Sequence, residues 1–173
     1  MSVLDLVFAP SAILNKKANN VINIDKDIKT LVSNMFDTMY KYNGVGLAAP
    51  QVNESLQILI MDCSKKDNEY KPITLINPII IDASKNIKLY KEGCLSFPEQ
   101  YFEVSRPEFV KVNYLDIDGK SREKVFNGFE AVCVQHEIDH LIGILFTSYI
   151  SRLRRQIILK KMQKFKKNLN KPI

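Results

Sequence analysis

The sequence contains no tryptophan, only two histidines and only three cysteines among its 173 residues. The cysteines, Cys63, Cys94 and Cys133, are odd in number, and no two of them are spaced as CxxC. This pattern argues against a disulfide framework and favours a reducing compartment. We therefore expect the protein to be cytoplasmic.

Long apolar runs are also missing. No stretch approaches the roughly 20 apolar residues that a membrane-spanning helix needs. Residues 1–17 carry no basic segment ahead of their apolar residues, so a secretory signal is not expected. Apolar residues make up 46% and charged residues 25%, as in an ordinary soluble globular protein. The length predicts a single domain over residues 1–173, and we expect neither a membrane nor DNA as a partner.

Acidic residues are absent from the last part of the chain. All 19 lie at or before Asp139, whereas nine arginine and lysine residues follow it. The formal net charge of +6 is therefore concentrated in a basic segment, for which a helix over about 148–168 is predicted. Its predicted apolar side consists of Ile150, Leu153, Ile157, Met162 and Phe165. The commonest role of such a helix is a solvated surface packed on the body, and the alternative is a nucleic-acid- or ribosome-binding module.

The rest of the chain predicts an α+β fold. A first helix is expected over about 26–42, because apolar residues recur there at helical spacing after the capping residue Asp25. A helix from Asn127 to about Gly143 is predicted with Glu130 as the partner in a capping box. The predicted strands cover 56–62, 73–81, 86–90 and 108–116, followed by a hairpin turn at 116–120 that leads into 121–126. We expect antiparallel sheets packed around the central helix, with one helix at each end of the chain.

Both histidines lie in one short stretch, QHEIDH at 135–140. On the predicted helix, His136 and His140 share one face and can bind one metal ion. Glu137 can then reach a metal-bound water as a general base. The alternative is two ordinary histidines on a solvated helix face. It is disfavoured because the apolar neighbours indicate a buried helix, where unpaired polar groups are costly.

A third metal ligand has to precede this motif. No Asp, Glu, His or Cys follows His140, which excludes the downstream ligands of the runner-up class, the HExxH endopeptidases. Cys133 lies about 10 Å of helical rise from His140, and Cys63 ends an apolar run that predicts a buried strand. Cys94 follows Gly93, and glycine lets the backbone approach a metal closely. Cys94 is therefore the best candidate, since a His₂Cys set with an open position is a catalytic arrangement.

Small residues fill the segment GVGLAAPQ at 44–51. They allow a ligand to pass close to the backbone, and the Gln51 amide can donate to a developing oxyanion. Together with EGCLS at 92–96 and QHEIDHLIG at 135–143, this segment resembles the motifs GxGLAAxQ, EGCxS and QHExDHLxG of the peptide deformylase family, in the same order. The resemblance covers nearly the full chain.

The resemblance implies a metal-dependent hydrolase that removes the N-formyl group from N-formylmethionyl nascent peptides and releases formate. Cys94, His136 and His140 would be the metal ligands, and the metal would be Fe²⁺, with Zn²⁺, Ni²⁺ or Co²⁺ as possible replacements. Glu137 would act as general acid/base on a metal-bound water. The Gln51 side chain and the Leu95 backbone N–H would hold the oxyanion.

The remaining implied roles concern the substrate. Gly46 would hydrogen-bond the peptide, and the pocket for the methionine side chain would be lined by Val45, Leu95, Val132 and Cys133. Asn53 stands where the family often has glycine, and asparagine tolerates left-handed backbone. Tyr101 stands where some members have arginine. For Asp139 we expect an ion pair with Arg106, and the basic C-terminal helix raises the possibility of ribosome association.

Overall fold

The computed structural model describes residues 2–64 and 71–169. Within these residues the main helices are α1 (Lys26–Lys41), α2 (Gly128–Leu141) and α3 (Arg152–Leu169). The strands are β1 (Gly46–Ala48), β2 (Ile58–Met61), β3 (Ile73–Ala83), β4 (Ile87–Cys94), β5 (Phe97–Pro107), β6 (Phe109–Leu115) and β7 (Ser121–Asn127). Short 3-10 turns occur at Ile13–Asn15, Ala49–Val52 and Phe146–Tyr149.

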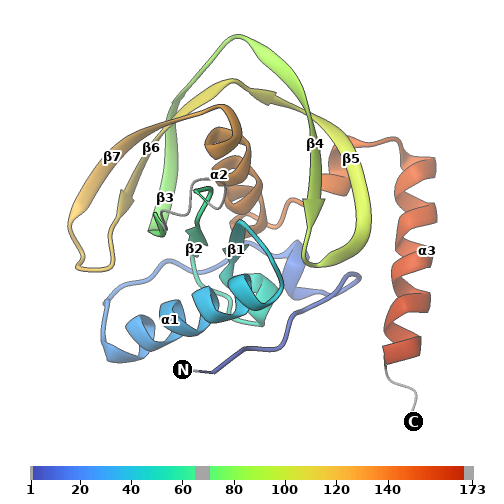
Figure 1. The fold of residues 1–173 in the computed structure, drawn as a ribbon, viewed down its shortest axis with the longest axis horizontal. Coiled ribbons are helices and arrows are strands. Elements are labelled where there is room, and N and C mark those ends of the chain that lie inside the picture. The colour runs from blue at the N-terminus through green and yellow to red at the C-terminus, as the bar shows by residue number, and fades with distance from the viewer. Residues whose placement is uncertain (1, 65–70, 170–173) are drawn as a thin grey trace.

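The strands form two antiparallel sheets around α2. One has five strands in the order β1-β2-β3-β6-β7, and the other is the two-stranded ribbon β4-β5. Figure 1 shows α2 in the middle of the molecule, between the five-stranded sheet and the β4–β5 ribbon. Residues 131–138 of α2 are all buried. The predicted α+β class, with antiparallel sheets around a central helix, is confirmed.

Helix α1 forms as the sequence predicts. The Asp25 carboxylate accepts a hydrogen bond from the Ile28 backbone N–H at 3.0 Å, which caps the first turn. Met35 and Met39 are fully buried in a core cluster that also contains Leu47 of β1. Burying such a side chain contributes about 1.5–3 kcal/mol to the stability of the fold, so the apolar stripe holds α1 against β1.

Three details of the predicted helices are wrong. Helix α3 begins at Arg152, because residues 146–149 form a 3-10 turn that precedes it. Its buried residues are Ile158 and Met162, whereas Leu153 and Ile157 of the expected apolar side are exposed. The Asn127 side chain makes no capping hydrogen bond at the start of α2, so the predicted capping box does not form.

Strand β5 has no counterpart among the predicted elements. It pairs with β4 along its length, from Ile87 opposite Pro107 to Gly93 opposite Tyr101. In the described part of the chain, no helix is both long and apolar enough to cross a membrane.

Candidate active site

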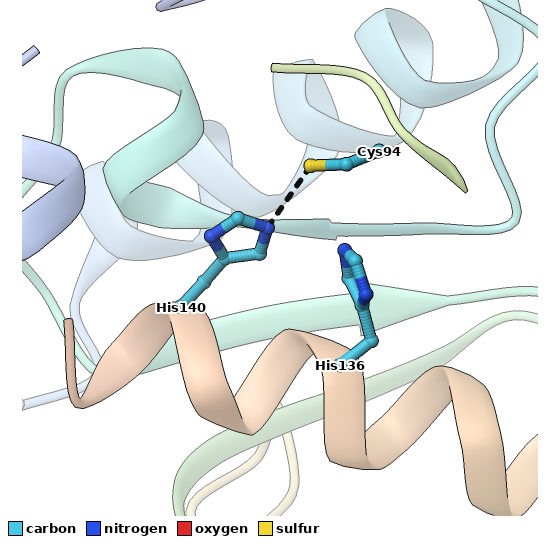
Figure 2. A group of neighbouring side chains, drawn as sticks. All are labelled: Cys94, His136 and His140. Carbon is cyan, nitrogen blue, oxygen red and sulfur yellow. Dashed lines mark hydrogen bonds between the residues drawn. The ribbon is translucent and has the colours of Figure 1, made fainter. Parts of the chain in front are cut away.

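Cys94, His136 and His140 meet beside α2 (Figure 2). Their ligand atoms all lie within 4.8 Å of one another, and Cys94 Sγ is 3.2 Å from His140 Nε2. The two histidines come from successive turns of α2, and Cys94 is the last residue of β4. One thiolate and two imidazoles are donors that zinc and other first-row transition metals accept, so these residues fit a divalent metal with an open position.

A chain of buried charges supports His136. Its Nδ1 lies 2.8 Å from Glu92 Oε2, which fixes the ring and leaves Nε2 for a metal. Arg106 donates to Glu92 Oε1 at 2.7 Å and to Asp139 Oδ2 at 2.6 Å, and Tyr149 donates to Asp139 at 2.8 Å. The expected ion pair between Asp139 and Arg106 is therefore confirmed.

The pKa values in this chain follow from its contacts. Burial acts to raise the pKa of Glu92, but the hydrogen bonds from His136 and Arg106 outweigh it and lower the pKa. Burial and the hydrogen bond to Asp139 raise the pKa of Tyr149 to about 12. Glu92 is therefore held as a carboxylate beside the guanidinium and the imidazole.

Glu137 lies on α2 next to His136 and is buried. Burial raises the pKa of Glu137 to about 7, which suits a group that gains and loses a proton near neutral pH. Among the described residues, neither Glu137 Oε2 nor His140 Nδ1 has a hydrogen-bond partner. Burial lowers the pKa of His140 well below its ordinary value, and a neutral ring is the form that binds a metal.

Gln51 directs its amide towards Cys94. Its Oε1 accepts a hydrogen bond from the Ala48 N–H at 2.8 Å, which leaves the NH₂ group for the site. Nε2 is 3.5 Å from Cys94 Sγ and 3.3 Å from Ser96 Oγ. Asn53 closes the 3-10 turn in the left-handed region, with φ of 66°, a conformation that asparagine adopts more readily than most residues.

Two neighbouring cavities surround this cluster. The lining of the larger, of about 620 Å³, includes Gly46, Gln51, Cys94, Leu95 and Glu137, and we call it the catalytic cavity. The second, of about 440 Å³, is lined by Val45, Phe129, Val132 and Cys133 together with His136 and Glu137. The two cavities therefore bring together the sequence-predicted site residues except His140, which joins the cluster through its contact with Cys94. Leu95, which was expected in the lining of the methionine pocket, lines only the catalytic cavity.

Cys63 and Cys133 lie apart from the ligand set. Cys133 is buried in a core cluster, and Cys63, just after β2, is half-buried against that cluster. Sequence reasoning did not identify Glu92 as the partner of His136, nor Tyr149 as the partner of Asp139. The signal for Glu92 was its place in EGCLS, two residues before Cys94, although the register shift between Gly93 and Cys94 breaks the regular alternation of strand faces there.

Comparisons with known proteins agree with this geometry. The family model described as Polypeptide deformylase matches residues 3–156. The peptide deformylase of Maricaulis maris is 41% identical over 168 residues, covering 97% of each chain. That of Brucella suis is 44% identical over 164 residues, covering 95% of this chain and 94% of the relative.

Solved structures are similar over the same length. A crystal structure of peptide deformylase from Ehrlichia chaffeensis in complex with actinonin has a TM-score of 0.91 and 38% identity, covering 95% of this chain and 98% of that chain. One from Legionella pneumophila has a TM-score of 0.90 and 40% identity, covering 99% and 100%.

Proposed function

The chain belongs to the peptide deformylase family, a family of metal-dependent hydrolases, and from this premise we propose that it hydrolyses the formyl group of N-formylmethionyl nascent peptides. Water adds to the formyl carbon, the C–N bond breaks, and formate and a free α-amino group are released. The observation that supports this most is the meeting of the ligand atoms of Cys94, His136 and His140 at the wall of a cavity that Glu137 also lines. We propose that residues 1–173 form one catalytic domain.

We assign the metal to Cys94, His136 and His140, with Fe²⁺ as the physiological ion and Zn²⁺, Ni²⁺ or Co²⁺ as replacements. When bound, the metal supplies the Lewis acidity that makes water nucleophilic at neutral pH. The thiolate supports a soft, electron-rich site, which favours such ions over Mg²⁺ or Ca²⁺. Glu92 positions His136 through the 2.8 Å contact with its Nδ1.

Glu137 is the general acid/base in this proposal. As a carboxylate it accepts a proton from the attacking water, and it then passes that proton to the leaving nitrogen. A pKa of about 7 allows both steps near neutral pH. The Gln51 NH₂ group and the Leu95 backbone N–H donate to the oxygen that becomes negative, and losing one such donor typically costs about 10²–10³-fold in rate.

The second cavity is the proposed methionine pocket. Val45, Val132 and Cys133 give it apolar walls, and it adjoins Glu137. Leu95 contributes from the catalytic cavity, where the backbone of Gly46 lies and hydrogen-bonds the peptide. A methionine side chain placed here brings its formyl group beside the general acid/base.

Formate release tests the proposal. The protein is purified without oxygen, loaded with Fe²⁺, Ni²⁺ or Co²⁺, and assayed with formyl-Met-Ala. Glu137→Ala is expected to keep its metal and lose turnover, whereas Glu130→Ala on the first turn of α2, outside both cavities, is the matched control that stays active. Absence of formate with all three metals would overturn the proposed function.

The ligand assignment has its own test. Cys94→Ser is expected to weaken metal binding, because it replaces a thiolate with a hydroxyl. Cys63→Ser, which changes a thiol outside the ligand set, is the control. Unchanged metal content in Cys94→Ser would exclude Cys94 as a ligand.

We further propose that the enzyme acts in the cytoplasm and associates with the ribosome through α3. The exposed lysines of that helix include Lys160, Lys164 and Lys167. Changing these three to glutamate should reduce co-sedimentation with ribosomes at low salt, because RNA contacts of this kind depend on neutralised phosphates. Removing the whole helix is a poorer test, since Ile158 and Met162 belong to the core. Co-sedimentation that is insensitive to salt would contradict an RNA contact.

A further inference from the structure

A third cavity, of about 400 Å³, lies between β5 and α3 and is rich in basic side chains. Its cations are Lys91, Arg154 and Lys161, and we call it the cationic pocket. Over the described ranges 2–64 and 71–169, none of these three side chains forms an ion pair with a carboxylate. Lys91 Nζ instead lies 5.5 Å from the centre of the Tyr101 ring. The pocket therefore holds positive charge that is free to meet an anion.

The helix side of the pocket is firmly placed. Arg154 and Lys161 are seven residues apart, about two helical turns, so they project from the same side of α3. Between them, Ile158 is buried in a cluster with Phe97 of β5, which fixes the helix against the ribbon. Figure 1 shows α3 running alongside β5.

The cationic pocket continues from the catalytic cavity. Glu99, Gln100 and Tyr101 line both cavities, and Tyr101 also lines the methionine pocket. A Cβ atom on Gly93 would lie 2.6 Å from Tyr101 Cε1, so the tyrosine ring covers the backbone directly before Cys94. A peptide leaving the catalytic cavity along β5 therefore passes Tyr101 and reaches the basic side chains.

We propose that the cationic pocket binds an acidic side chain at the third or fourth residue of the substrate peptide. The proposal rests on the deformylase function proposed above. Tyr101 lines all three cavities, so we place the second residue of a peptide with methionine in its pocket beside this ring. An extended chain advances about 3.3 Å per residue, and we place the next two residues in the cationic pocket. Glu99 is the one acidic side chain in the lining, so three cations against one carboxylate leave the pocket positive.

Peptides that differ only in having glutamate or glutamine at one position test the proposal. Their C-termini are amidated, so that no terminal carboxylate can bind the cationic pocket in place of the side chain. The series is formyl-Met-Ala-Ala-Ala amide, with the exchange at the third or at the fourth residue. At low ionic strength, kcat/KM for the glutamate peptide is expected to exceed that for its glutamine isostere by about two- to fivefold at one of these positions, the range that exposed ion pairs give. High salt should reduce this ratio.

Three variants locate the effect. Arg154→Ala/Lys161→Ala should bring the ratio of glutamate to glutamine close to one. Glu99→Gln should raise the ratio, because it removes the opposing carboxylate. Lys26→Ala/Lys85→Ala makes the same change in net charge at exposed lysines outside the pocket and should keep the wild-type ratio.

The outcomes separate this inference from the proposed function. The inference is wrong if formyl-Met-Ala releases formate but the ratio of glutamate to glutamine is one at both positions. It is also wrong if Arg154→Ala/Lys161→Ala keeps the wild-type ratio, because the cationic pocket then does not bind the acidic side chain. If a short RNA binds the wild type but not Arg154→Ala/Lys161→Ala, and the ratio of glutamate to glutamine is one, the pocket binds phosphate groups instead and the proposal is wrong. If no peptide releases formate, the proposed function fails and the inference fails with it.

Discussion

Replacing Gly46 with alanine is expected to disable catalysis while leaving the metal ligands in place. A Cβ atom at this position would lie 2.5 Å from Glu137 Oε1 and 2.8 Å from Cys133 Sγ. Ordinary contact begins at 3.4 Å, so the carboxylate has to retreat by roughly 0.9 Å. Misplacing a reacting group by about 1 Å costs about 10²-fold in rate, and we expect a loss of that size in kcat.

The measurement is formate release from formyl-Met-Ala, with metal content determined on the same samples. Gly44→Ala is the matched control, because its Cβ would meet the flexible end of Leu95, Cδ1, at 2.8 Å. That methyl group can turn away, so the loss should stay below about tenfold. The double variant Gly46→Ala/Cys133→Ala removes the contact with the thiol and keeps the contact with the carboxylate. Recovery of activity in this double variant, or wild-type kcat in Gly46→Ala, would refute the assignment of the loss to Glu137.

Three further predictions concern metal affinity, pH and stability. Glu92→Gln removes the carboxylate beside His136, so the affinity for the metal should fall about 10- to 100-fold. Competition with a chelator measures this affinity, and a dissociation constant equal to that of the wild type would contradict the prediction. Burial acts to raise the pKa of Asp62, but hydrogen bonds from neighbouring hydroxyl and backbone groups lower it below the ordinary 3.8. A carboxylate with a lowered pKa stabilises the fold above its unfolded pKa and loses that contribution as the pH falls through its folded pKa. Below pH 3.8 the free energy of unfolding of Asp62→Asn should therefore depend less on pH than that of the wild type. Denaturant unfolding at a series of acid pH values measures this dependence, and equal slopes for the two proteins would argue against the prediction. Gly143 has a φ of 76°, and a Cβ there would lie 2.8 Å from the Asn15 backbone carbon. Gly143→Ala should therefore lower the free energy of unfolding, measured in urea, by about 1–3 kcal/mol. A decrease below about 0.5 kcal/mol would count against this explanation.

The elements with a strong local pattern could be predicted from the sequence. Helix α1 carries both its capping residue, Asp25, and its apolar stripe within one segment. Strand β5 could not be predicted in this way, because Pro98 and Pro107 near its ends resemble strand breakers and its polar residues alternate irregularly. Its pairing with β4 is a contact between segments, and it exists only once the ribbon has formed.

The same distinction applies to the site. The three metal ligands could be proposed from residue chemistry and from the absence of acceptable donors after His140. The contact between Glu92 and His136 depends on which face of β4 turns inward, and a register shift of one residue would reverse that face. The missing capping bond at Asn127 has a local cause, since Gly128 takes a φ of 55° at the point where the strand turns into α2.

The buried charges around Arg106 act on ligand geometry more than on stability. Paired charges in a protein interior contribute little net stability, because desolvation offsets their attraction, although removing one partner costs about 3–5 kcal/mol. Glu92 belongs to β4, which also carries Cys94, and Asp139 belongs to α2, which also carries His136. Arg106 of β5 bonds to both carboxylates and thereby ties together the two elements that supply the ligands. A substitution at Arg106 should therefore disturb the spacing of the thiolate and imidazoles even where the fold survives.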